Sequence, residues 1–151
     1  MPAAEVHTID ISEQALAVAK KNADAQGISI QFHLLDILNE SLWRQLHKFD
    51  IIVSNPPYIT EKEEEDMHNN VLLHEPHNAL FVPNKQPLLF YEAIASFGLQ
   101  HLKSNGLLFF EINEAYGKEM SELLTAKGYR DIELRKDMQG KDRMIKAELF
   151  S

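Results

Sequence analysis

The stretch FDIIVSNPPYI, residues Phe49–Ile59, decides the fold class of this chain. Its first half, FDIIVS, is an almost continuous apolar run, which is typical of a parallel strand covered on both faces. Pro56 and Pro57 end this strand, because proline has no N–H to donate to a neighbouring strand. A residue before a proline avoids the helical region, so Asn55 and Pro56 remain extended. The stretch therefore predicts a buried strand that ends at a rigid corner.

Strand and helix patterns alternate before this stretch. Ala3–Ile11, which contains EVHTIDI, and the segment ISIQFHLLDI, residues 28–37, are rich in β-branched and apolar residues and are predicted to be strands. Ser12 is a good N-cap for a helix between them, and Gly27 is a typical stop. A short helix is expected around residues 41–47.

The same alternation continues after the corner. Residues 60–87 are long and polar for a connection, which is usual for functional or disordered segments. LLFYEAIASFGLQHLK then predicts a helix that ends near Asn105–Gly106, and LLFFEI predicts another buried strand. GKEMSELLTAKG is expected to be a helix closed by Gly128. YRDIELRK and DRMIKAELF, joined by DMQGKD, are typical of an antiparallel hairpin.

This order of elements predicts an α/β fold: a mostly parallel sheet with right-handed crossovers and a C-terminal antiparallel hairpin. In such sheets, ligands bind beyond the carboxyl ends of the strands. The polar residues at or just past those ends are Asp10, Asp36, Asn55–Tyr58 and Glu111.

The corner presents two acceptors to the same space, the side-chain oxygen of Asn55 and the carbonyl of Pro56. Two converging acceptors suit an NH2 group, which has two hydrogens to donate, and Tyr58 can stack on the planar group that carries this nitrogen. Accepting both hydrogens polarises a weakly nucleophilic amide or aromatic amine. The alternative is an ordinary strand-to-loop turn, because all of these residues favour turns.

Composition limits the class of protein and of partner. The chain has 151 residues, 44% of them hydrophobic and 25% charged, which fits one globular domain. It has no cysteine, which suits a cytoplasmic protein, and no apolar run approaches membrane-spanning length. The net charge of −8 and the acidic run EKEEED, Glu61–Asp66, make nucleic acid an unlikely partner.

Several single residues have more than one interpretation. Asp10 suits a sugar diol, as in dinucleotide-binding folds, or is a helix-start acid stabilised by the helix dipole. Asp36 has an Asx-turn as its alternative. Glu111 is read as a hydrogen-bonding residue at the strand end. His74 and His77 lack further clustered ligands, so no metal site is expected.

With these motifs in order, the chain resembles the catalytic domain of the HemK/PrmC family, the peptide-chain release factor N5-glutamine methyltransferases. The resemblance covers nearly the whole chain and rests on VHTIDIS, FHLLDIL, FDIIVSNPPYI, HEPHNALF, LLFYEAI, GLLFFEI and DMQGKDRMIKA. Asn-Pro-Pro-Tyr alone is shared with many amino-methyltransferases. Its combination with EPxxAL and DxxGxDR is more specific.

The resemblance implies a class I, Rossmann-like methyltransferase fold that uses S-adenosylmethionine. It implies that Asp10, flanked by Ile11, binds the ribose hydroxyls, and that Asp36 and Ile37 lie beside the adenine. The substrate amide would be held by Asn55, Pro56, Pro57 and Tyr58, with Asn55 also next to the cofactor. The implied substrate is the glutamine in the Gly-Gly-Gln loop of a class I peptide-chain release factor. A nucleic-acid amino-methyltransferase acting on N6 of adenine or N2 of guanine is the alternative, because it needs the same grip.

The sequence also departs from the family pattern. EIN stands where the family has EIG, and the FVPNKQP segment is built differently from the family's glycine-rich run. The first strand and its G-x-G loop are not found before Ala3. We therefore expect residues 1–151 to be a partial catalytic domain that is inactive alone. Its free strand edges are expected to cause homo-oligomerisation or a rearranged sheet.

Overall fold

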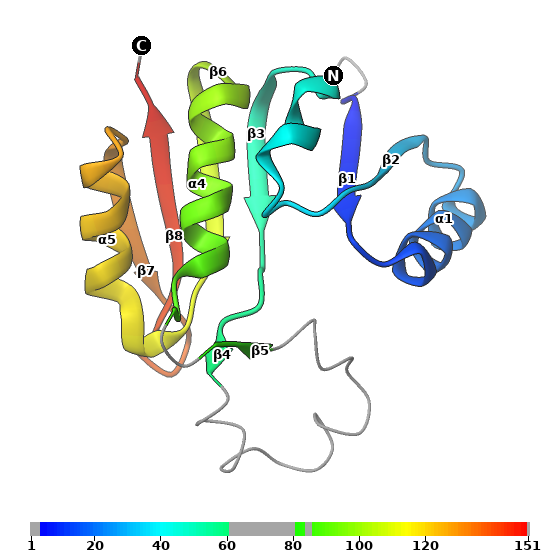
Figure 1. Ribbon diagram of the computed structural model, residues 1–151. Coiled ribbons are helices and arrows are strands. Elements are labelled where there is room, and N and C mark those ends of the chain that lie inside the picture. The colour runs from blue at the N-terminus through cyan, green and yellow to red at the C-terminus, as the bar shows by residue number, and fades with distance from the viewer. Residues whose placement is uncertain (1–3, 61–80, 84–85, 151) are drawn as a thin grey trace. The chain divides into compact units, whose positions relative to one another are not determined.

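The computed structural model describes residues 4–60, 81–83 and 86–150 (Figure 1). The chain divides into two compact units, Met1–Gln45 and Leu46–Ser151, and each is described by itself. His74 and His77, for which a metal site was not expected, lie outside the described residues.

The first unit is a parallel strand pair with one α-helix and one 3-10 helix. Strand β1 (Val6–Asp10) pairs with β2 (Ile30–Leu34) in parallel, and helix α1 (Glu13–Gln26) connects them. The side chain of Ser12 accepts a hydrogen bond from the Ala15 N–H, and Gly27 follows the helix with a positive φ of 65°. Both predicted ends of this helix are confirmed. The short helix expected next is a 3-10 helix, η1 (Glu40–Gln45).

The second unit is built on a four-stranded sheet in the order β3-β6-β8-β7. Strand β3 (Phe49–Ser54) is parallel to β6 (Leu102–Glu111). Strand β8 (Asp142–Leu149) is antiparallel to β6 and to β7 (Arg130–Lys136), which confirms the predicted terminal hairpin. Two short strands after the corner, β4 (Ile59–Thr60) and β5 (Phe81–Val82), form a separate parallel pair.

Helices α4 (Leu89–His101) and α5 (Gly117–Ala126) contact each other; α4 packs on β6, and α5 packs on β7 and β8 (Figure 1). A 3-10 helix, η3 (Glu114–Tyr116), precedes α5. The buried side chains of this unit alternate along the central strands. They include Leu108, Phe110 and Ile112 on and just after β6, Ile145 and Ala147 on β8, and Tyr91, Ile94, Met120 and Leu124 on the helices.

The predicted end of the second long helix, near Asn105–Gly106, is wrong. Helix α4 ends at His101, and β6 begins directly afterwards. Asn105 and Gly106 lie in an irregular part of β6, where Phe49 pairs with Leu102 but Ile51 pairs with Leu107. A Cβ at position 106 would lie 2.8 Å from the Lys103 carbonyl oxygen, so glycine allows a bulge here and does not mark a helix stop.

The prediction that FDIIVS is covered on both faces is also wrong for this chain. Ile51 is 55% exposed and Val53 is 74% exposed. Within the described part of the chain, β3 pairs only with β6, and β1 pairs only with β2. Each of these two strands therefore has a free edge, as the sequence analysis expected.

Gly98 is needed where α4 meets the residue before β7. A Cβ at Gly98 would collide with the hydroxyl of Tyr129, which is buried and donates a hydrogen bond of 2.8 Å to the Ala95 carbonyl. We expect Gly98→Ala to lower the free energy of unfolding by about 1–3 kcal/mol, because the overlap outweighs the better helix propensity of alanine.

Tyr129→Phe provides the matched background, since it removes only the colliding oxygen. In that background Gly98→Ala should be close to neutral, which gives a positive coupling in a double-mutant cycle measured by chemical denaturation. An equal loss of stability in both backgrounds would contradict this contact.

Candidate active site

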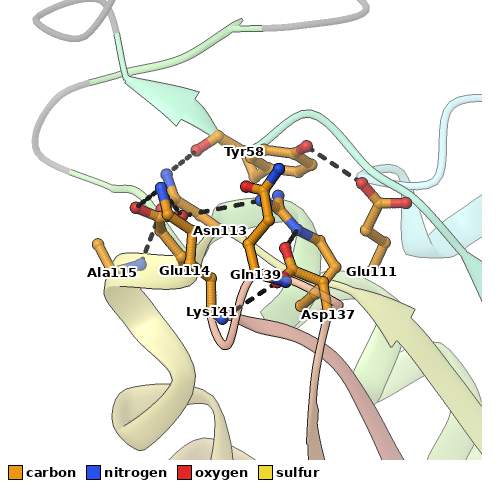
Figure 2. A network of polar contacts seen from close by, with 9 residues as sticks. Tyr58, Glu111, Asn113, Glu114, Ala115, Asp137, Gln139 and Lys141 are labelled. Atoms are coloured by element: carbon orange, nitrogen blue, oxygen red, sulfur yellow. Dashed lines mark hydrogen bonds and ion pairs between the residues drawn. The ribbon is translucent and has the colours of Figure 1, made fainter.

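The polar residues of the second unit gather at one end of its sheet. Ser54 pairs with Phe110 in the parallel pair of β3 and β6, so Asn55 and Glu111 follow at neighbouring strand ends. Strand β8 is antiparallel to β6, and its first residue, Asp142, is therefore at the same end. Figure 2 shows the resulting cluster, in which Tyr58, Glu111 and Asn113 lie close to the turn that contains Asp137 and Lys141.

The corner carries the two predicted acceptors, the Asn55 side-chain oxygen and the Pro56 carbonyl oxygen. Asn55 is exposed, Pro56 is buried, and Pro57 and Tyr58 are half-buried. No described residue donates a hydrogen bond to the Asn55 side chain or to the Pro56 carbonyl.

Tyr58 is held at both of its polar ends. Its hydroxyl donates a hydrogen bond of 3.2 Å to Oε1 of Glu111, and its carbonyl accepts one of 3.3 Å from Nδ2 of Asn113 (Figure 2). Partial burial raises the pKa of the Tyr58 phenol, and the negative charge of Glu111 raises it further, while Arg143 acts in the opposite direction. The phenol is therefore neutral at physiological pH and acts as a donor.

The hairpin turn between β7 and β8 is ordered by Asp137. Its Oδ1 accepts hydrogen bonds from the backbone N–H of Gln139 at 2.8 Å and of Lys141 at 3.1 Å. The bond from Lys141 contributes most to lowering the pKa of the Asp137 carboxyl, and the bond from Gln139 lowers it further. Glu114 lies 2.8 Å from Nζ of Lys141 and 3.8 Å from Nη2 of Arg143. The DxxGxDR motif thus shapes the turn beside the corner.

Four of the five residues predicted to hold the cofactor lie in the first unit, and the fifth, Asn55, lies in the second. Asp10 is the last residue of β1, and Asp36 comes two residues after β2. The Leu35 N–H donates a hydrogen bond of 3.0 Å to the Asp10 carbonyl, which joins these two strand ends. One oxygen of Asp10 accepts from the Ser12 N–H at 2.7 Å, and one oxygen of Asp36 accepts from the Leu38 N–H at 2.9 Å. The Asx-turn considered for Asp36 is therefore present.

The second oxygen of each carboxylate has no partner among the described residues. Ile11 is 60% exposed, whereas Ile37 is half-buried and its carbonyl accepts a hydrogen bond of 3.1 Å from Nε1 of Trp43. The first unit thus offers two carboxylate oxygens and apolar surface, which fits a sugar diol next to a flat base.

Other kinds of site find no support in the described residues. They contain no group of three or more His, Cys, Asp or Glu side chains that could hold a metal ion. None of the helices among them is long and apolar enough to cross a membrane.

Sequence reasoning missed two contributors to this site, Asn113 and Arg143. Asn113 is 7% exposed and caps η3, where its Oδ1 accepts a hydrogen bond of 2.9 Å from the Ala115 N–H. The available signal was position: Asn113 lies two residues after Glu111, so an extended chain puts both side chains on the same side. Arg143 belongs to a motif that was recognised but had no assigned role.

Comparison with known proteins gives the family. Residues 1–85, more than half of the 151, match the family model described as methyltransferase small domain. The chain belongs to this family. A relative from Bacteroides thetaiotaomicron named release factor glutamine methyltransferase is 46% identical over 147 residues, covering 97% of this chain and 52% of that protein. The predicted family resemblance is confirmed, and the chain spans about half the length of the curated relatives it matches.

Solved structures share the fold. A methyltransferase from Pyrococcus furiosus matches with a TM-score of 0.66 and 15% identity, covering 97% of this chain and 64% of that one. A putative methyltransferase complexed with SAH matches with a TM-score of 0.60 and 16% identity, covering 97% and 40%. The predicted class I methyltransferase fold is confirmed.

From the contact between Tyr58 and Glu111 we predict how the titration of Tyr58 changes when Glu111 is replaced. The pKa of Tyr58 is higher in the folded chain than in the unfolded chain, where it is about 10. The protonated phenol therefore stabilises the fold fully below about pH 10, and this stabilisation is lost as the pH rises through the pKa of the folded chain. Glu111→Gln removes the negative charge, so the pKa of Tyr58 should fall towards about 10.

The measurement is a pH titration of the phenol carbon in chains labelled with 13C-tyrosine, with Tyr58→Phe to assign the signal. Glu122→Gln is the matched control, because Glu122 is exposed on α5 and pairs only loosely with Lys118, at 3.6 Å. A Tyr58 titration that is the same in Glu111→Gln and Glu122→Gln would show that Glu111 does not act on Tyr58.

Proposed function

We propose that this chain carries the active site of an S-adenosylmethionine-dependent methyltransferase. Its substrate would be the glutamine side-chain amide in the Gly-Gly-Gln loop of a class I peptide-chain release factor. The observation that carries the proposal is the corner at Asn55, where an exposed amide oxygen and a carbonyl without a described donor stand beside a tyrosine held at both ends. The name of the Bacteroides relative supports the choice of substrate.

The chemistry follows from the needs of the nitrogen. An amide nitrogen is a weak nucleophile because its lone pair is delocalised into the carbonyl group. Asn55 Oδ1 and the Pro56 carbonyl would each accept one N–H, which polarises the nitrogen and fixes the direction of its lone pair. Tyr58 would stack on the plane of the amide. Alignment of this kind can lower a barrier by about 7–11 kcal/mol.

The cofactor assignments are part of the proposal. When bound, S-adenosylmethionine supplies an electrophilic methyl group whose bond to sulfur breaks as the bond to nitrogen forms. The free oxygen of the Asp10 carboxylate would accept from the ribose hydroxyls, with Ile11 beside it. Asp36 and Ile37 would contact the adenine, and Asn55 would lie next to the methyl group. Support comes from the class I fold and from the SAH bound to one protein of that fold.

A nucleic-acid amino-methyltransferase would use the same corner. Such an enzyme needs clustered basic residues to bind phosphates, whereas this chain has a net charge of −8 and 23 acidic residues against 15 basic ones. Charge therefore favours a protein substrate. A cytoplasmic location, which a release factor as partner would require, stays a prediction.

Transfer of a labelled methyl group from S-adenosylmethionine tests the proposal directly. Because residues 1–151 are expected to be inactive alone, the assay uses a chain in which they are extended to the length of the curated relatives. This extended chain is the wild type of the transfer assays, and it should label a class I release factor and leave RNA and DNA unlabelled. Asn55→Ala should reduce transfer at least a hundredfold, because it removes one of the two acceptors for the reacting NH2 group. Affinity for S-adenosylhomocysteine, measured by calorimetry, should change far less.

Asn22→Ala, on the exposed surface of α1, is the control and should match the wild type in both assays. Labelling of nucleic acid in preference to the release factor would select the alternative function. An equal loss of transfer and of cofactor affinity in Asn55→Ala would assign Asn55 a structural role.

We also propose that the chain self-associates through its free strand edges. Strand β3 exposes Ile51 and Val53 and has unpaired backbone groups along one edge within the described residues. Edges of this kind pair with other chains. Val53→Lys should therefore lower the average mass in light scattering, because a lysine on an edge strand opposes pairing.

Val18→Lys is the control for the added charge, since Val18 is 58% exposed and belongs to helix α1, not to a strand. It should leave the average mass unchanged. A wild-type chain that is monomeric at the same concentration would contradict self-association.

A further inference from the structure

Tyr58 is held by two residues from one short segment at the end of β6, Glu111 and Asn113. Glu111 is the last residue of that strand, and Asn113 comes two positions later in an extended conformation with φ −65° and ψ 130°. Successive side chains of an extended chain alternate, so residues 111 and 113 point to the same side. One accepts from the Tyr58 hydroxyl at 3.2 Å, and the other donates to the Tyr58 carbonyl at 3.3 Å (Figure 2).

The backbone of residues 111–113 is itself held by two hydrogen bonds, one from α4 and one to β8. The Tyr91 hydroxyl, on α4, donates a hydrogen bond of 3.2 Å to the Glu111 carbonyl. The Ile112 N–H donates one of 2.8 Å to the Arg143 carbonyl on β8. Ile112 is fully buried between them. The segment that carries Glu111 and Asn113 is therefore anchored to both the helix and the sheet.

The amide of Asn113 can lie in only one orientation. Its Oδ1 accepts from the Ala115 N–H at 2.9 Å, and its Nδ2 donates to the Tyr58 carbonyl at 3.3 Å. Reversing the amide would place an oxygen against a carbonyl and an NH2 group against an N–H, which loses both bonds. The side chain is 7% exposed, so water cannot replace them easily.

We propose that Asn113 is a positioning residue that, together with Glu111, fixes the Tyr58 ring in the plane needed to stack on a primary amide. The proposal rests on the proposed function for the role of Tyr58, and it adds the residues that determine the angle of the ring. The hydrogen bond to Glu111 fixes the hydroxyl end of the ring, and the hydrogen bond from Asn113 fixes the backbone from which the side chain extends. The ring can then neither swing away nor rotate freely when a planar amide enters the corner.

Asparagine is the residue that this double task requires. Aspartate and serine cap a helix as well as asparagine does, but aspartate cannot donate to a carbonyl and serine is too short to span the same distance. Glycine, which the resembled family has in its EIG motif, offers neither bond. A substitution that removes only the side-chain N–H donor of residue 113 therefore breaks the bond to Tyr58 and keeps the cap of η3.

Asn113→Asp and Asn113→Ser are the test variants, and Asn22→Asp on the exposed surface of α1 is the control for an added charge. The first readout is the Tyr58 ring signal in chains labelled with 13C-tyrosine, with Tyr58→Phe for assignment. Both Asn113 variants should shift and sharpen this signal as the ring gains freedom, while the Tyr91 and Tyr129 signals stay in place. Asn22→Asp should leave all of them unchanged.

The second readout is the kinetics of methyl transfer to the release factor. Both Asn113 variants should lower kcat by about tenfold to a hundredfold, as expected for a loss of alignment, with S-adenosylhomocysteine affinity within about twofold of wild type. A Tyr58 signal that stays as in the wild type in both variants overturns the proposal, as does an unchanged kcat.

The two readouts separate this inference from the proposed function. A wild-type protein that labels no release factor contradicts the proposed function and leaves the Tyr58 signal to decide whether Asn113 fixes the ring. Should Asn113→Asp fail to fold because its buried carboxylate faces a carbonyl, the uncharged Asn113→Ser decides both readouts alone.

Discussion

The parallel pairing of β3 with β6 is the constraint on which the candidate site depends. Ser54 opposite Phe110 puts the corner beside the segment that follows β6, and only this register brings Tyr58 within reach of Glu111 and Asn113. A shift by one residue would move every side chain of β3 to the other face. The buried Leu108 and Phe110 of β6 and the half-buried Phe49 and Ile52 of β3 hold the register, so their packing determines the geometry at the sheet's end.

The charged residues around the corner order the backbone more than they stabilise the fold through ion pairing. The contacts of Glu114 with Lys141 and Arg143 are half-exposed, and ion pairs of this kind add little to stability. Asp137 instead orders the hairpin turn through backbone N–H groups, and the turn places Arg143 near Tyr58. The cations beside the corner are paired with these carboxylates, and the Asn55 side chain and the Pro56 carbonyl have no hydrogen-bond donor among the described residues.

Sequence patterns predicted the element order well because each boundary had a local cause. Ser12 and Gly27 delimit α1, and the prolines end β3 as proline chemistry requires. The end of α4 was misplaced because Asn105 and Gly106 are equally good helix stops and bulge residues, and only pairing with β3 selects the bulge. The role of Asn113 could not be predicted, because its partner is 55 residues away in the chain and the contact exists only once the sheet has formed.

The hold on the Tyr58 carbonyl comes from a side chain, and this has an evolutionary consequence. Contacts between main-chain groups persist through most substitutions, whereas a contact made by one asparagine can be gained or lost in a single mutational step. Homologues can thus differ in how firmly the Tyr58 ring is held, without any change in the Asn-Pro-Pro-Tyr residues themselves. Under the proposed function, a substitution at position 113 would lower turnover and widen the range of partner shapes that the site accepts, although residue 113 does not touch the reacting groups.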